Sequence, residues 1–179
     1  MDKEIATKQA TNALLLGIAR VLSESHSAYA TWLLAGFSAA FTLVLANMDI
    51  ATKYIETASI KSALYVFLYS IGLAVIQKWI NSVIQGGFKG GEEGNKVDIA
   101  LAQNNMEIDQ EFVLKEIEKA TWYPARFLIK WQYNKVRQGD LLVVGRQQFK
   151  LAQLVGLLLL AQISFALYSL WLIIGGIRV

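Results

Sequence analysis

The fold is decided by residues 151–177, which read LAQLVGLLLLAQISFALYSLWLIIGGI and carry no formally charged side chain. Residues 25–48 form a second uncharged window. Each window is long enough to cross a bilayer, which takes about 20 predominantly apolar residues. A third apolar segment, residues 62–77, lies between Lys61 and Lys78, whose ammonium groups can reach opposite interfaces. The sequence therefore predicts an all-α, polytopic transmembrane protein with three spans.

Composition supports this class and excludes several kinds of chemistry. Hydrophobic residues make up 55% and charged residues 17% of the 179, which is more apolar than a soluble domain. The absence of cysteine excludes disulfides, thiolate catalysis and cysteine-ligated metals. His26 is the only histidine, so two-histidine metal sites are excluded as well. We expect no enzymatic activity, no catalytic residue, no metal and no cofactor.

Orientation follows from the positions of lysine and arginine. Lys3, Lys8 and Arg20 precede the first span, and the long connection between the second and third spans carries most of the remaining basic residues. Positive charge stays on the cytoplasmic side. We expect the bacterial inner membrane, with the N-terminus in the cytoplasm and the C-terminus outside. We expect the first span itself to direct insertion, without a cleavable signal.

Four segments are expected along the chain. Residues 1–26 form an amphipathic helix with a leucine face, either lying on the inner leaflet or acting as a regulatory arm. Residues 27–85 form a transmembrane hairpin, and residues 151–179 the third span. Residues 86–150 form a cytoplasmic segment that opens with a glycine hinge at 86–94. Its helical pattern over residues 98–138 is bent near Pro124, since proline lacks an amide hydrogen.

The first span carries a stripe of small residues at steps of three and four. Helices in lipid attract one another largely where small residues let their backbones approach. The stripe is therefore expected to face protein or water, and the bulky flank around it, which includes Phe37 and Phe41, to face lipid. Helix packing and the lining of a pore both remain open for the stripe, whose candidate residues are Thr31, Ala35, Ser38 and Thr42.

Polar residues follow one face of each of the other two spans. Buried amides are costly unless they meet partners or water. A wet vestibule and an interhelical hydrogen-bonded seam both fit this pattern. The candidates are Ser70, Gln77 and Asn81 in the second span and Gln162 and Ser169 in the third.

Charge in the cytoplasmic segment is divided. Residues 92–118 are strongly acidic, and residues 119–150 are strongly basic with Asp140 as their only acid. Aromatic residues mixed with lysine and arginine favour anionic headgroups or an anionic ligand such as a nucleotide. The acidic half is expected to pair with the basic half of a neighbouring subunit or to concentrate cations at a pore mouth. The membrane-interface or anionic-ligand candidates are Trp122, Arg126, Lys130, Trp131, Lys135 and Arg137.

The layout of an amphipathic start, three striped spans and a charged helical insert resembles small bacterial membrane effectors of anti-phage defence, and to a lesser degree three-span holins. The resemblance implies a homo-oligomeric channel or pore in the inner membrane, gated by the cytoplasmic segment. A non-conducting accessory or scaffold subunit of a larger membrane complex is the alternative. The expected partners are the lipid bilayer, further copies of the chain and a cytoplasmic regulatory protein or anionic small-molecule signal. No nucleic acid is expected.

Overall fold

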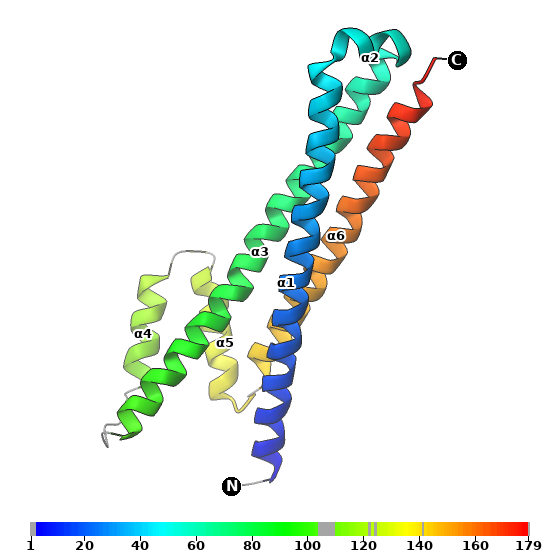
Figure 1. The fold of residues 1–179 in the computed structure, drawn as a ribbon. Coiled ribbons are helices and arrows are strands. Elements are labelled where there is room, and N and C mark those ends of the chain that lie inside the picture. Colours follow the sequence, from blue (N-terminus) through cyan, green and yellow to red (C-terminus); the bar gives the residue numbers. More distant parts are fainter. Residues whose placement is uncertain (1–2, 104–109, 122, 124, 141, 179) are drawn as a thin grey trace. The chain divides into compact units, whose positions relative to one another are not determined.

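A computed structural model describes residues 3–103, 110–121, 123, 125–140 and 142–178 (Figure 1). Over these residues the fold is helical and no strand is formed. The helices are α1 (Lys3–Ala46), α2 (Met48–Tyr54), α3 (Thr57–Gln103), α4 (Gln110–Ala120), α5 (Ala125–Arg137) and α6 (Val143–Gly175). An isolated antiparallel bridge joins Ile55 to Ile177. The prediction of an all-α fold is confirmed for this part of the chain.

Three of the helices, α1, α3 and α6, are long and apolar enough to cross a membrane, as predicted. They contain 44, 47 and 33 residues. At a rise of about 1.5 Å per residue, even the shortest is roughly 50 Å long, against a hydrocarbon core of about 30 Å. Each helix therefore extends well past the length that a bilayer requires.

The chain divides into two compact units. The charged unit contains Met1–Arg20 and Ile84–Lys150, and the apolar unit contains Val21–Val83 and Leu151–Val179. The helices α1, α3 and α6 each contribute one part to each unit. The N-terminal segment is therefore grouped with the long connection rather than standing as a separate element.

Two local predictions differ from the structure. Of the helix predicted over residues 1–26, the described residues 3–26 are the first part of α1, which runs without a break to Ala46. The predicted glycine hinge is helical, because α3 continues through residues 86–94 to Gln103. Glycine keeps its amide hydrogen, so it weakens a helix by only about 1 kcal/mol relative to alanine.

One of these glycines lies close to a side chain of α6 in the charged unit. A Cβ added at Gly87 would lie 2.8 Å from Nε2 of Gln148, at the start of α6. Nearby, the Arg20 guanidinium is 2.6 Å from the Glu92 carboxylate, which links α1 to the glycine-rich part of α3. The glycine-rich part of α3 is therefore a helical segment with contacts to α1 and α6 inside the charged unit.

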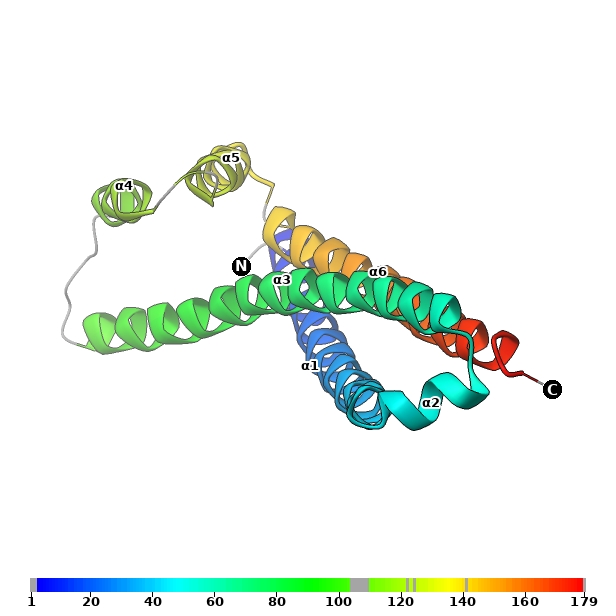
Figure 2. The ribbon, with the colours of Figure 1, turned by 90° about the horizontal axis from the view of Figure 1, so that it is seen from above.

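In the apolar unit, α1 and α3 are joined through α2 (Figure 2). The two helices pack through aromatic rings. Phe41 and Phe67 are buried and stacked, with ring centroids 4.5 Å apart. Phe37 lies against this cluster. Phe41 is 3% exposed, so the expectation that its whole flank of α1 faces lipid is wrong. Leu172 and Ile173 of α6 pack against the cluster that contains Phe41 and Phe67.

The end of α6 is fixed to the connection between α2 and α3. The amide of Glu56 donates to the Gly176 carbonyl at 2.9 Å, and the amide of Arg178 donates to the Tyr54 carbonyl at 2.8 Å. A Cβ at Gly176 would clash with Ser59. The lack of a side chain at Gly176 therefore permits this close backbone contact.

In the charged unit, α4 and α5 run antiparallel and side by side (Figures 1 and 2). The Arg137 guanidinium lies 2.9 Å from the Glu111 carboxylate and 4.9 Å over the Tyr133 ring. The hydrogen bond from Arg137 and its charge, together with Lys115, hold the pKa of Glu111 below its ordinary value. The acidic half thus pairs with the basic half within one chain at this point. Pairing with the basic half of a neighbouring subunit stays a prediction.

Candidate functional site

The first candidate site is a buried polar seam between α3 and α6 in the apolar unit. The Ser70 hydroxyl donates to the Gln162 main-chain carbonyl at 3.3 Å, and the Gln77 amide donates to the Gln162 side-chain oxygen at 3.0 Å. All three side chains are fully buried. The spacing of seven residues in α3 places Ser70 and Gln77 on one face, where Gln162 meets both of them.

The seam continues toward α1. The Ser23 hydroxyl donates to the Asn81 side-chain oxygen at 2.7 Å, and both residues are buried. Close by in sequence, the Lys78 ammonium donates to the Thr31 hydroxyl at 2.6 Å. Ser23 was not among the predicted site residues, because it lies outside the uncharged window that begins after Glu24.

Some polar atoms of the seam have no hydrogen-bond partner in the described part of the chain. Among the described residues, no hydrogen-bond partner reaches Oε1 of Gln77, Nδ2 of Asn81, Nε2 of Gln162 or the Ser169 hydroxyl. An unpaired buried polar group costs about 1–3 kcal/mol. Any water or partner group that reached these atoms would therefore stabilise the seam.

His26 adds a further polar group to the interior of the apolar unit. Its Nδ1 is buried and has no hydrogen-bond partner in the described part of the chain. Its ring packs on α6 where a Cβ at Gly156 would lie 3.0 Å from Cε1. The sequence showed only that this histidine is unique, and its contact with a glycine in α6 could not be seen from spacing.

The small-residue stripe of α1 has a different position from the seam. Thr31, Ala35, Ser38 and Thr42 are all exposed on the apolar unit. Thr31 and Thr42 donate their hydroxyls to the main-chain carbonyls four residues earlier, each at 2.8 Å. The stripe is therefore left open on the surface of a single chain, with part of its hydrogen-bonding capacity used within the helix.

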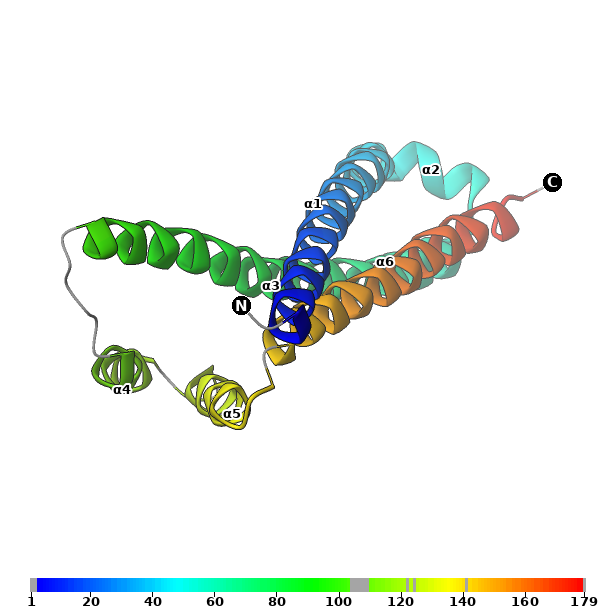
Figure 3. The same cartoon turned by 90° about the horizontal axis from the view of Figure 1, so that it is seen from below.

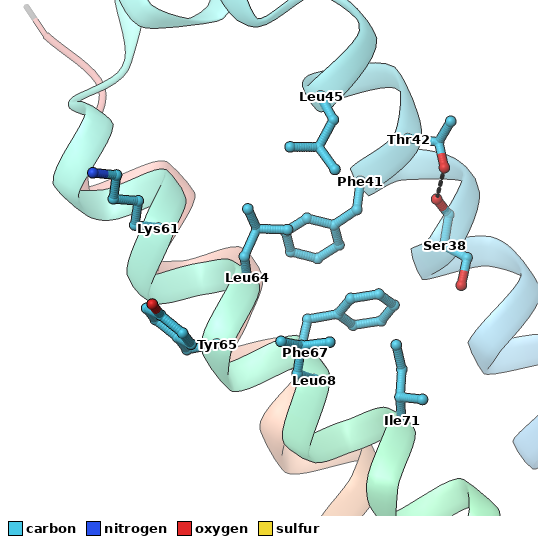
Figure 4. A pocket seen from close by; sticks show the side chains of 10 residues that line it. All are labelled: Ser38, Phe41, Thr42, Leu45, Lys61, Leu64, Tyr65, Phe67, Leu68 and Ile71. Carbon is cyan, nitrogen blue, oxygen red and sulfur yellow. Dashed lines mark hydrogen bonds between the residues drawn. The ribbon is translucent and has the colours of Figure 1, made fainter.

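An apolar groove of about 580 Å³ lies beside this stripe, between α1 and α3 (Figure 4). Phe41 and Phe67 form its base, and Ser38 and Thr42 lie along its α1 side. Lys61 stands at one end as its only charged lining residue. The groove is thus almost wholly hydrocarbon in character.

The second candidate site is a basic pocket of about 390 Å³ in the charged unit. It is built where α5 ends and α6 begins, a connection visible in Figure 3. We call it the basic pocket throughout. Its lining residues are Trp131, Lys135, Asp140, Val143, Arg146, Gln147 and Lys150.

The turn at Gly139 produces this pocket. Gly139 has φ of 85°, a conformation that other residues rarely adopt. Its amide donates to the Val136 carbonyl at 2.9 Å, and the amide of Asp140 donates to the Lys135 carbonyl at 3.0 Å. This pair of bonds is a Schellman motif, which ends α5 and reverses the chain. The reversal brings Lys135 beside the first turns of α6.

Of the six predicted interface or anionic-ligand residues, Trp131 and Lys135 line the basic pocket. Arg137 is paired with Glu111 instead, and Arg126 and Lys130 do not line the pocket. Trp122 lies outside the described residues. Arg146 and Lys150 were not predicted as binding residues, because they follow the turn and its reversal of the chain was not foreseen. Gly139 was the residue in the sequence that could have indicated this turn.

No protein-family model, curated protein or solved structure matches this chain.

Proposed function

We propose that the chain is a polytopic protein of the bacterial inner membrane that self-associates through α1 and forms a channel or pore gated by its charged unit. The N-terminus lies in the cytoplasm and the C-terminus outside, in accord with the positions of lysine and arginine. The observation that carries the proposal is the exposure of the α1 stripe, since small residues left open on one chain are suited to close contact with another.

The position of the seam supports this choice of α1. Ser70, Gln77, Asn81, Gln162 and Ser169 are buried within one chain, so they act as helix-packing residues in the protomer. Three helices enclose no aqueous path, and several copies are therefore required. The hydroxyl-bearing face that remains open for a shared water-filled axis is the one formed by Thr31, Ser38 and Thr42.

The charged unit supplies a means of gating. Its ion pairs include Glu111 with Arg137 and Glu92 with Arg20, both at exposed positions. Exposed pairs are weak and respond to salt and to competing ions. A regulatory protein or an anionic signal that competes for the arginines would rearrange this unit at low energetic cost. The resemblance to anti-phage effectors gives bacterial defence as the cellular role.

The test is Ser38→Leu, with Ser164→Leu as the matched control. Both serines are exposed, and each lies in an uncharged stretch, but Ser164 is on α6, away from the stripe. We measure the native mass in mild detergent and ion flux from liposomes. A discrete oligomer of the wild type whose flux is altered by Ser38→Leu and unaffected by Ser164→Leu supports the proposal. A wild-type monomer without flux would overturn it.

The alternative is a non-conducting accessory or scaffold subunit of a larger membrane complex. The burial of the seam favours it, because the polar faces of α3 and α6 meet each other inside one chain and are not open to a shared axis. In that case the α1 stripe docks a different membrane protein. Loss of a co-purifying membrane protein on Ser38→Leu, with no conductance in the wild type, would identify this function.

A further inference from the structure

We propose that the basic pocket binds a phosphate-bearing anion. Three cationic side chains line it, from Lys135, Arg146 and Lys150, against a single acid, Asp140. Asp140 is already engaged, because its Oδ1 pairs with Arg146 and accepts from the amide of Leu142 at 3.3 Å. The charge of the pocket is therefore positive after its internal ion pair is taken into account.

The two lysines provide the unused positive charge. In the described part of the chain, neither the Lys135 nor the Lys150 ammonium has a hydrogen-bond or ion-pair partner, and each lines the same cavity. They come from opposite sides of the turn, Lys135 from the last turn of α5 and Lys150 from α6. An anion between them would be held by two elements at once.

The walls of the pocket are fixed before any ligand arrives. The Gln132 amide donates to the Gln147 side-chain oxygen at 2.6 Å and so ties α5 to α6. The Schellman motif at Gly139 and the bond from the Leu142 amide to Asp140 hold the connection between them. Binding groups held in place lose little freedom when a ligand binds, which raises affinity.

A phosphate group fits this arrangement better than a simple monovalent anion. Phosphate carries more charge and more acceptor oxygens, so it can meet both lysines, which act as point charges, together with the donors of Arg146 that are not used on Asp140 and on the Leu142 carbonyl. The volume of about 390 Å³ exceeds the needs of one small ion and leaves room for the group esterified to the phosphate. Trp131 lines the same cavity and is 43% exposed, so its ring offers a flat surface for that group.

Two sources can supply this chemistry, an anionic phospholipid headgroup or a soluble phosphate compound. Lys150 directly precedes the uncharged window that begins at Leu151. If α6 spans the bilayer, Lys150 stands at headgroup level, where basic residues meet anionic lipid. The lipid source rests on the membrane insertion proposed above, whereas the soluble source does not.

The experiment compares the wild type with the double variant Lys135→Gln/Lys150→Gln. The matched control is Lys53→Gln/Lys89→Gln, which removes the same charge from exposed positions outside the pocket. In one arm, proteins from nanodiscs of phosphatidylcholine with or without phosphatidylglycerol are analysed by native mass spectrometry for retained lipid. In the other arm, inorganic phosphate and pyrophosphate are titrated at constant ionic strength in detergent, and the shift in melting temperature is measured.

Retention of phosphatidylglycerol by the wild type and the control, but not by the double variant, supports a lipid headgroup. A melting-temperature shift with phosphate or pyrophosphate that only the double variant loses supports a soluble ligand. We expect affinity to fall about tenfold for each ammonium removed, as for a charge-assisted hydrogen bond. Equal binding by all three proteins, or no binding by the wild type in either arm, would overturn the proposal.

A second variant, Lys135→Arg/Lys150→Arg, separates charge from folding, because it keeps both cations and should restore binding. The native mass and liposome flux of the wild type report the proposed function independently. An oligomer that conducts but binds no phosphate would refute the pocket alone. A monomer that binds phosphate would refute the channel alone.

Discussion

The sharpest prediction concerns the amide pair of the buried seam. In the present structure Gln77 and Gln162 share one hydrogen bond, and each keeps one unpaired atom, Oε1 of Gln77 and Nε2 of Gln162. Replacing either residue by leucine removes the bond but leaves two unpaired polar atoms on the surviving amide. The number of unpaired atoms is unchanged, so the cost is that of the bond alone, about 1 kcal/mol.

The double variant Gln77→Leu/Gln162→Leu should behave differently. It loses the same single hydrogen bond but also removes both unpaired atoms, each of which costs about 1–3 kcal/mol in the wild type. The double variant should therefore be more stable than the wild type by about 1 kcal/mol or more, although both single variants are less stable. Ser70 is unaffected, since it bonds to the main-chain carbonyl of residue 162.

The assay is reversible unfolding in mixed detergent micelles, followed by circular dichroism, with the four proteins analysed as a double-mutant cycle. Gln153→Leu is the control, because Gln153 is exposed on α6; its effect should stay within about 0.5 kcal/mol. A double variant as destabilised as the sum of the single variants would refute the reasoning. Single variants without effect would show that water already satisfies the amides, as in a wet vestibule.

Three further predictions follow from local geometry. Gly176→Ala should destabilise the fold by about 1–3 kcal/mol through overpacking, whereas Gly175→Ala, which meets open space, should not; thermal unfolding distinguishes them. The pKa of Glu111 is lowered in the folded chain from an ordinary value of 4.5. Its ionised carboxylate therefore stabilises the α4–α5 pairing fully above pH 4.5, and that stabilisation is lost as the pH falls through the lowered pKa. Protection of the α4 amides, measured as exchange relative to the intrinsic rate at each pH, should therefore fall at acid pH, and Arg137→Gln should remove most of that dependence. Gly139→Ala forces a side chain into a left-handed conformation that costs about 1–2 kcal/mol, so it should lower the melting temperature and weaken phosphate binding together.

The long helices could be predicted because length and composition along the sequence are enough to identify them. Runs without charge identify α1 and α6 by length, and the shorter run at 62–77 identifies α3 once its two flanking lysines are allowed to reach the interfaces. The structure confirms three helices long and apolar enough to cross a membrane. Helical spacing also grouped the polar residues of α3 and of α6 correctly onto one face each. Ser70 and Gln77 meet Gln162 because those two faces turn toward each other.

Which face each helix turns toward its neighbours could not be predicted. The stripe of α1 and the polar faces of α3 and α6 look alike in sequence, yet the stripe is exposed and the polar faces are buried. On α1 the contact with α3 is made by Phe41, which stacks on Phe67, while the small residues beside it stay exposed. A pairwise ring contact between residues far apart in sequence leaves no trace in spacing.

Glycine was the other ambiguous signal. The same residue type continues a helix at Gly87, ends one at Gly139 and permits the close approach of Ser59 at Gly176. Composition alone favoured a hinge over residues 86–94, because clustered glycines are common in linkers. Only Gly139 has a conformation that requires glycine, and it lies outside that cluster.

The attachment of the chain's end to the α2–α3 connection has a mechanical consequence. The two backbone hydrogen bonds there, Glu56 to Gly176 and Arg178 to Tyr54, lie side by side like a short piece of antiparallel ladder. A pull on the C-terminus would load both bonds together before it reached the turns of α6. Force applied there should thus detach the final residues in one step, ahead of any unwinding of the helix.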